Sequence, residues 1–468
     1  MASPPAYSSD EMALHGRRLT RSEDFPVATE VKRLAFCLSW EFLAGVKEVD
    51  MDIQCVVVNS AGHICDACYY NNMKALGRAI THSGDSLDGK DPDVDEKITV
   101  HLDRLGQDVS LLVFVVCCFS GGTFANVLQG MFRVVDEATY SATGTKPTLA
   151  QYKLSDKGNH TADILCVMHR HNAAGQWKVR TIDQVLQGAH FMDILNPIQE
   201  TIRIFIPTAP KRQKLAFSMR KGNVFDFASS QSAVICALGW DTTMGEVDLD
   251  ASCVLLDKNG QMIESVFFGN LESKRHGIIH SGDNLTGEGE GDDEQITCYL
   301  DRVGPEVACL YFCINIYSPN RTFRQVANPY ARVVDPNTGD EYCRYQLSDA
   351  GMSSGLIIAR LQRDKTNRWG FHALGVPANG RLYKDCLPEM QRLLSVETRN
   401  LYQRGHTMEL HQQNPGIVAM PTQLGGGGAG SVVMVTHMPG GQAGLATAPP
   451  PPAQAPGPDK QNKCCVIQ

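Results

Sequence analysis

The strongest constraint on the fold of this chain is an internal repeat. The tetrapeptide HSGD occurs at His82–Asp85 and again 198 residues later, at His280–Asp283. The pattern V-D-x-D precedes each copy, with the same offset, at Val49–Asp52 and Val247–Asp250. Self-similarity at a long fixed offset indicates two copies of one folding unit, each of which must bury its own apolar residues.

The repeat divides the chain of 468 residues into two modules and a tail. We place module 1 at residues 11–205 and module 2 at residues 214–395, with a basic, proline-containing linker at residues 206–213. Residues 404–468 are rich in Gly and Pro and contain no aromatic residue. Such a composition cannot bury enough apolar surface to order itself, so we predict a disordered Gly/Pro-rich tail.

Within each module, short apolar runs alternate with turn signals, which predicts an all-β fold. In module 2 the stretch from Asp250 to Asn270 contains two runs separated at Lys258–Gly260, the pattern of a hairpin. The longest apolar run, Leu111–Phe119, is too short to span a bilayer and predicts a buried strand. Helical periodicity is confined to Lys384–Ser395 and to its counterpart around Ala189–Thr201. We therefore expect two tandem β-sandwich modules with short terminal helices.

Module 2 carries a dense acidic loop. Residues 283–294 contain six carboxylates and no Lys or Arg, and glycines are interspersed among them. Carboxylates held about 6 Å apart at a protein surface repel each other by about 3 kcal/mol, so a folded loop of this kind needs a counter-charge. The glycines allow carboxylates and carbonyls to turn inward together, as a hard oxygen-liganded divalent cation requires. The spacing differs from that of an EF-hand, and a solvated acidic loop is the alternative.

Several motifs of module 2 together resemble the TerD domain of tellurium-resistance and stress proteins. They are G-W-D at Gly239–Asp241, V-D-L-D-A-S at Val247–Ser252, the acidic loop that begins at His280, and W-G-F-H-A-L-G at Trp369–Gly375. Module 1 looks like a diverged copy. The resemblance implies a TerD-like β-sandwich that binds calcium through the acidic loop and the D-x-D strand, and that acts as a binding or scaffolding module in stress responses.

The predicted calcium ligands of module 2 follow from the resemblance and from strand geometry. Asp248 and Asp250 lie two residues apart on a predicted strand, so both side chains face the same side. The loop supplies the remaining ligands, some through water or backbone carbonyls: Asp283, Asn284, Glu288, Asp292, Asp293 and Glu294.

Module 1 keeps much of this acidity but departs from the pattern. Its candidate ligands are Asp50, Asp52, Asp85, Asp95 and Glu96. In an ungapped alignment, however, Lys90 stands at the position of Glu288 and Val94 at that of Asp292. We expect weaker or altered metal binding in module 1, where Lys90 could even replace the cation by pairing with its acidic neighbours.

The chain ends in a prenylation signal. Cys465-Val466-Ile467-Gln468 is a C-a-a-X box whose final Gln favours farnesyl, and the adjacent Cys464 is a candidate for palmitoylation. One lipid chain gives only reversible membrane binding, so a second signal is expected. No signal peptide is recognisable at the N-terminus and cysteines are abundant, which predicts free thiols in the cytoplasm. We expect a cytoplasmic protein bound peripherally to membranes by its lipid.

Other function classes find less support. The net charge of −8 argues against nucleic-acid binding, which depends on Lys and Arg. The sequence shows no G-x-S-x-G elbow, Walker loop or H-E-x-x-H motif, so we do not expect an enzyme. The leading interpretation is a calcium-binding scaffold or signalling protein that recruits unidentified protein partners. A small-molecule (cyclic nucleotide) binding protein and a calcium-dependent hydrolase are the alternatives.

Overall fold

The structure is a computed structural model, and it describes most of both modules. The described residues are 17–18, 22–41, 45–46, 49–86, 94–120, 122–138, 148–154, 157–171, 176–212, 215, 217–242, 248–284, 291–347, 351–364 and 366–395. Glu288, Lys90, Cys464, Cys465 and the tail predicted at residues 404–468 lie outside them. Among the described residues, no helix is long and apolar enough to cross a membrane.

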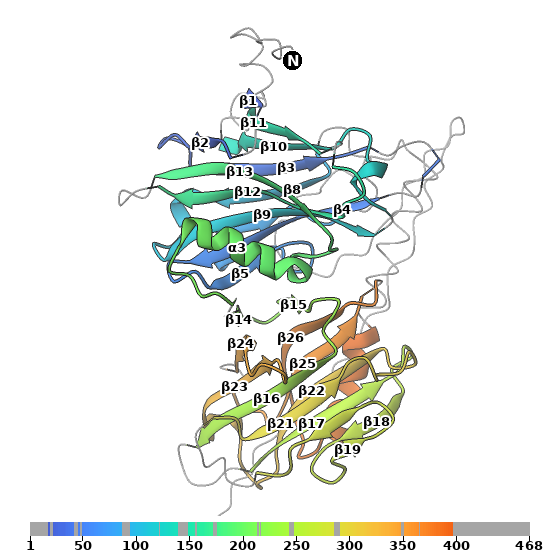
Figure 1. The fold of residues 1–468 in the computed structure, drawn as a ribbon. Coiled ribbons are helices and arrows are strands. Elements are labelled where there is room, and N and C mark those ends of the chain that lie inside the picture. The colour runs from blue at the N-terminus through green and yellow to red at the C-terminus, as the bar shows by residue number, and fades with distance from the viewer. Residues whose placement is uncertain are drawn as a thin grey trace, which may run out of the picture. The chain divides into compact units, whose positions relative to one another are not determined.

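Module 1 consists of two sheets, and all but one of their strand pairings are antiparallel (Figure 1). The seven-stranded sheet has the order β1 (Arg17–Arg18), β11 (Thr148–Lys153), β10 (Met131–Asp136), β3 (Arg33–Ser39), β8 (Glu96–His101), β7 (Ile80–His82) and β6 (Lys74–Ala75). The six-stranded sheet has the order β2 (Asp24–Pro26), β13 (Trp177–Leu186), β12 (Ala162–Arg170), β9 (Val109–Ser120), β4 (Asp50–Asn59) and β5 (Ile64–Cys68). Short 3₁₀ turns lie at Leu76–Arg78, Leu102–Arg104, Phe124–Asn126 and Phe191–Ile194.

Module 2 repeats this topology strand for strand. Its seven-stranded sheet has the order β14 (Phe217–Met219), β24 (Glu341–Gln346), β23 (Val326–Val334), β16 (Ala233–Thr242), β21 (Glu294–Tyr299), β20 (Ile278–His280) and β19 (Glu272–Ser273). Its six-stranded sheet has the order β15 (Val224–Asp226), β26 (Trp369–Ala378), β25 (Gly355–Arg363), β22 (Cys309–Ile316), β17 (Leu249–Leu256) and β18 (Met262–Val266). A 3₁₀ turn lies at Phe323–Gln325. The sequence prediction of two all-β sandwich modules is confirmed.

The two sheets of module 1 pack face to face over an aromatic centre. Phe36 on β3 stacks on Phe114 on β9, with ring centroids 3.7 Å apart, and both side chains are fully buried. In module 2, the predicted hairpin is present as β17 and β18, and Gly260 has a positive φ of 78° in its turn. A left-handed residue at that position suits Gly because it has no Cβ.

A helix covers the outer face of the six-stranded sheet in each module. In module 1 this is α3 (Leu195–Phe205) (Figure 1). Its Ile198 and Ile202 pack on the side chains of β9 that face away from the sandwich. In module 2 it is the helix at residues 383–395, which packs on β17, β22 and β25. Because β9 is buried on both faces, Leu111–Phe119 is a continuous apolar run without alternation.

The first terminal helix begins later than its sequence pattern suggests. A 3₁₀ turn at Phe191–Ile194 precedes the α-helical residues. Pro197 has no backbone N–H and is tolerated only in the first turn of an α-helix. The α-helix therefore begins close to Pro197, at Leu195.

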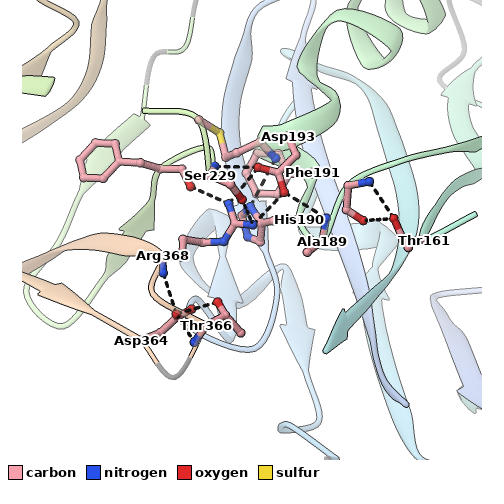
Figure 2. Close-up of polar contacts among 12 residues, drawn as sticks. Thr161, Ala189, His190, Phe191, Asp193, Ser229, Asp364, Thr366 and Arg368 are labelled. Carbon is pink, nitrogen blue, oxygen red and sulfur yellow. Dashed lines mark hydrogen bonds and ion pairs between the residues drawn. The ribbon is translucent and has the colours of Figure 1, made fainter. Parts of the chain in front are cut away.

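The two modules belong to one compact unit and contact each other through buried polar groups. Arg368 of module 2 forms a two-pronged ion pair with Asp193 of module 1, with N–O distances of 3.1 and 2.7 Å (Figure 2). The backbone N–H of Ser229 also donates to Asp193, at 2.8 Å. Burial favours neutral Asp193, yet the Arg368 guanidinium outweighs it and lowers the pKa of this carboxyl to about 2.

A second group of contacts joins β15 of module 2 to the turn after β5 in module 1. The Tyr69 hydroxyl donates to the carbonyl of Val224 at 3.1 Å, and the Asn71 amide donates to Asp226 at 3.0 Å. Burial raises the pKa of Asp226 to about 6, although the Asn71 and Tyr69 hydrogen bonds oppose the rise. The turn that follows β5 in module 1 is thus covered by module 2.

Candidate metal centre

Three carboxylates converge at one end of module 2. Asp248 directly precedes β17, Asp250 is the second residue of β17, and Asp283 follows β20 in the HSGD segment. One oxygen from each of the three lies within 4.8 Å of the other two. Gly282 turns the HSGD segment toward β17 with a φ of 115°, a conformation that side-chain-bearing residues rarely adopt. We call Asp248, Asp250 and Asp283 the module 2 triad.

The triad concentrates negative charge in a partly buried site. The Asp250 side chain is buried, with 5 % of the residue exposed, whereas Asp283 is exposed. Burial and the neighbouring triad carboxylates raise the pKa of Asp248 to about 6 and that of Asp250 to about 7. Buried oxygens of both residues, Oδ1 of Asp248 and Oδ2 of Asp250, have no hydrogen-bond partner among the described residues. A buried carboxylate oxygen without a donor is costly, and a cation would satisfy it.

Three further predicted ligands of module 2, Asn284, Asp293 and Glu294, frame this triad and bond to protein groups. Glu294 is buried, and its two oxygens accept from the backbone N–H groups of Ala251 at 2.7 Å and Asn284 at 3.2 Å. Asp293 accepts from the backbone N–H of Trp240 at 2.8 Å and from the side-chain amide of Asn284 at 3.1 Å. These bonds hold the HSGD segment against β17 and so place Asp283 beside Asp250.

Asp292 is oriented away from the triad. Its two oxygens accept from Nε and Nη2 of Arg332 on β23, both at 2.8 Å, and the Tyr330 hydroxyl donates to it at 3.0 Å. The Asp292 side chain is 3 % exposed in this pair. Among the described residues predicted as ligands in module 2, the structure therefore brings three to one point. Asn284, Asp293 and Glu294 lie around them, whereas Asp292 pairs with Arg332 instead.

Module 1 contains the same arrangement. One oxygen each of Asp50, Asp52 and Asp85 lies within 4.8 Å of the others, with Asp50 and Asp52 buried and Asp85 exposed. We call these residues the module 1 triad. Glu96 accepts from the backbone N–H groups of Ile53 at 2.9 Å and Ser86 at 3.2 Å, as Glu294 does in module 2. Asp95 likewise accepts from the backbone N–H of Trp40 at 2.9 Å.

Of the two substitutions that separate module 1 from the pattern, Lys90 for Glu288 lies outside the described residues, and Val94 for Asp292 lies outside the triads. Val94 replaces Asp292, whose partner in module 2 is Arg332; in module 1 the matching Arg133 instead donates to the Ser39 hydroxyl at 3.0 Å. The difference at this position therefore removes an ion pair and leaves the three converging carboxylates unchanged. The expectation of weaker binding in module 1 stays a prediction.

One framing residue was missed by the sequence reasoning although the repeat contains it. His280 is buried, with Nε2 3.5 Å from Glu294, and His82 has the same distance to Glu96 in module 1. Burial disfavours protonated His280, but the hydrogen bond with Glu294 outweighs it and raises the His280 pKa. The signal was present in the first residue of HSGD, which recurs in both modules.

The donor set indicates the kind of ion that each triad can hold. Aspartate oxygens are hard ligands that suit calcium or magnesium, and calcium accepts six to eight oxygens in flexible geometry. Within the described residues, the groups of three or more side chains suited to hold a metal are these two Asp triads, and neither includes His or Cys. Cys65 and Cys68 of the C-x-x-C segment are free thiols on β5.

Comparison with known proteins agrees with the repeat. A family model described as the TerD domain matches residues 17–196 and 215–386. The chain is 40 % identical over 170 residues to tellurium resistance protein TerZ of Serratia marcescens, a match that spans 34 % of this chain and 86 % of that protein. It is 35 % identical over 198 residues to stress response protein SCP2 of Bacillus subtilis, spanning 37 % of this chain and 98 % of that protein.

Among solved structures, the chain is similar to a homologue of telluride resistance protein (TerD) from Streptomyces coelicolor. The identity is 22 %, the TM-score is 0.31, and the match covers 35 % of this chain and 98 % of the other.

Proposed function

Because this chain belongs to the TerD family and carries two copies of its domain, we propose that it is a calcium-binding protein with one site in each module. The proposal rests chiefly on Asp250, a buried carboxylate whose Oδ2 has no donor and lies in a cluster with two further carboxylates. Such a cluster is destabilising when empty and becomes favourable once a divalent cation neutralises it.

Calcium suits the sites better than magnesium. Magnesium demands near-ideal octahedral geometry and releases its waters reluctantly, whereas calcium tolerates irregular oxygen sets. In each triad two carboxylates come from the D-x-D segment on the six-stranded sheet and one from the loop after a strand of the seven-stranded sheet, with the loop carboxylate exposed to solvent. Water and backbone oxygens would complete the coordination.

We further propose that the protein is tethered to cytoplasmic membrane faces by prenylation at Cys465 and takes part in a stress response. The C-a-a-X sequence supports the tether, and the names of the relatives, tellurium resistance and stress response proteins, support the role. In this proposal the modules act as calcium-dependent scaffolds for protein partners at the membrane.

Isothermal titration of the full chain tests the calcium sites. We expect two calcium ions per chain, with magnesium binding more weakly, and one ion each in the variants Asp52→Asn and Asp250→Asn. The two variants make the same chemical change at matching positions, 198 residues apart, so each serves as the control for the other. Failure of wild-type protein to bind calcium at millimolar concentration would contradict the proposal.

A further inference from the structure

The end of module 2 that carries the triad also exposes apolar side chains. Tyr317 follows β22, is 42 % exposed, and donates its backbone N–H to the carbonyl of Asp248 at 2.9 Å. The half-buried Phe268 ring lies beside it, with centroids 6.0 Å apart. Leu271 is 44 % exposed, and its carbonyl accepts from the backbone N–H of His280, three residues before Asp283. These side chains adjoin the carboxylate cluster from two sides.

Met352 adds a fourth apolar side chain at the same end. It is 64 % exposed and lies two residues before Ser354, whose carbonyl accepts from the backbone N–H of Ile316 at 2.8 Å. We call Phe268, Leu271, Tyr317 and Met352 the apolar rim. Large apolar side chains exposed together in this way mark a surface that binds a partner or a membrane.

A guanidinium lies within this rim. Arg381 is exposed, stacks over the Tyr317 ring at 4.4 Å from its centroid, and donates Nε–H to the Tyr317 carbonyl at 2.8 Å. Burial and the Asp283 carboxylate raise the pKa of Asp248, and Arg381 is close enough to the triad that its charge opposes this rise. Arg381 and a cation in the module 2 triad would therefore present two positive charges beside exposed apolar side chains.

The corresponding end of module 1 is partly covered by module 2, although Met73, at the position of Leu271, is 42 % exposed. Tyr70 and Phe119 stand at the positions of Phe268 and Tyr317, and their rings are in contact at 5.1 Å. Strand register supports the correspondence, because Met51 pairs with Cys118 on β4 and β9 as Leu249 pairs with Ile316 on β17 and β22. Phe119, however, is only 7 % exposed.

Module 2 docks beside this pair of rings through polar groups of the adjoining turn. Tyr69 donates to Val224, and Asn71 donates to Asp226. In module 1 this end of the fold therefore contacts the other module, whereas in module 2 the same end exposes the apolar rim.

The chemistry of the module 2 end differs from that of a module-binding surface. Phe267 and Gly269 stand where Tyr69 and Asn71 supply the docking hydrogen bonds, so both donors are lost. Arg381 stands at the position of Ala189, because each residue donates its backbone N–H to an aspartate four residues later. Arg381 donates to Asp385 at 2.9 Å, and Ala189 donates to Asp193 at 3.0 Å. Loss of hydrogen-bond donors together with gain of a guanidinium favours a lipid surface over a second copy of the chain. Aromatic side chains with one polar end, such as Tyr, are enriched at the membrane–water interface.

We propose that this end of module 2 binds the surface of an anionic phospholipid membrane. Headgroup phosphate oxygens are shared between the calcium in the triad and the Arg381 guanidinium, while the apolar rim enters the headgroup region. The inference rests on the calcium site proposed above and identifies its partner. It predicts that calcium converts a surface repelled by anionic lipid into one attracted to it.

Vesicle co-sedimentation of the unprenylated full chain tests the inference, because the lipid tether is then absent. Vesicles of phosphatidylcholine with about one third phosphatidylserine are compared in millimolar calcium and in EGTA. We expect binding in calcium only, weakened about fivefold by Arg381→Gln, since one basic residue near an anionic surface contributes about that factor. Tyr317→Ser and Met352→Ser should weaken binding as well. Ile204→Ser is the matched control for Met352→Ser, since Ile204 is equally exposed, 64 %, but lies on α3 of module 1.

Each outcome supports or overturns the inference. Equal binding in EGTA, or unchanged binding by the Arg381 and Tyr317 variants, overturns it. If soluble glycerophosphoserine, at the concentration that the vesicles supply, competes with vesicle binding, the site binds free phosphate esters and the inference is overturned. If calcium causes self-association without vesicle binding, the site binds a second copy of the chain, which also overturns the inference. Calcium titration of the same samples separates the two proposals: calcium binding without vesicle binding refutes only the membrane contact, whereas absence of calcium binding refutes the site itself.

Discussion

Replacing Asp250 by Asn should stabilise the calcium-free protein and at the same time remove most of the stabilisation that calcium gives. Asn has nearly the shape of Asp but no charge. In EGTA the substitution removes repulsion within the module 2 triad, whereas in calcium it removes a ligand. The order of stability of wild type and variant should therefore reverse between the two conditions.

The size of the effect follows from the triad geometry. Two unit charges 4.8 Å apart repel by about 3.5 kcal/mol at an effective dielectric of 20, and Asp250 has two such neighbours. Asp248 is partly exposed and Asp283 is exposed, so solvent screening reduces the sum. We expect a gain on the order of 2 kcal/mol in EGTA, which corresponds to about 4–8 °C in Tm for a module of this size.

In calcium, the wild type is stabilised by binding the ion, and the variant lacks most of this stabilisation. Binding at a concentration 100 times the Kd stabilises the folded state by about 2.7 kcal/mol. Differential scanning calorimetry of the full chain at pH 8, in EGTA and in calcium, measures both effects. Asp301→Asn is the control: it makes the same charge change at an exposed residue just beyond the other end of β21. It should leave the calcium shift unchanged.

One result would refute this reasoning. If Asp250→Asn lowers the Tm in EGTA and leaves the calcium-induced shift intact, the three carboxylates neither repel strongly nor hold the ion. The oxygens of Asp250 would then have a purely structural role in β17.

Three further predictions concern pH, the module interface and the tail. The pKa values of Asp248 and Asp250, about 6 and 7, lie above the ordinary 3.8, so the folded protein binds protons at these carboxyls more tightly than the unfolded chain does. The stabilisation that their protonation gives is fully present below about pH 4 and is lost as the pH rises through 6 and 7. Protons and calcium compete there, and the calcium-induced Tm shift should grow from pH 5.5 to pH 8. Asp193→Ala should cost about 3 kcal/mol in urea denaturation because it leaves Arg368 buried without its carboxylate, and adding Arg368→Met should recover part of that; a cost below about 1 kcal/mol would contradict the ion pair's role. Cys465→Ser should abolish the farnesyl mass increment and detergent partitioning in a eukaryotic host, and a retained lipid would show that the box is not the modification site.

Much of the fold could be predicted from the sequence because its signals are local or repeated. Turn residues at Lys258–Gly260 separate two apolar runs, and these are the hairpin of β17 and β18. The apolar run at Leu111–Phe119 is a strand buried on both faces, since α3 covers the side that the sandwich does not. Such features depend on side-chain period and on backbone preference, which neighbouring residues determine.

The sequence by itself determined the two-module organisation, the sandwich class and the acidic neighbourhood of each candidate site. Only the tertiary structure decided which carboxylates meet. Asp292, Asp293 and Glu294 are consecutive in sequence, yet Asp292 pairs with Arg332 on β23 and Asp293 with the backbone of Trp240 on β16. Asp283, in contrast, reaches Asp250 on the other sheet. Successive side chains point in different directions, and their partners are brought close only when distant strands pack. For the same reason, tertiary contacts buried Phe119 of module 1 and left its counterpart Tyr317 exposed beside the module 2 triad.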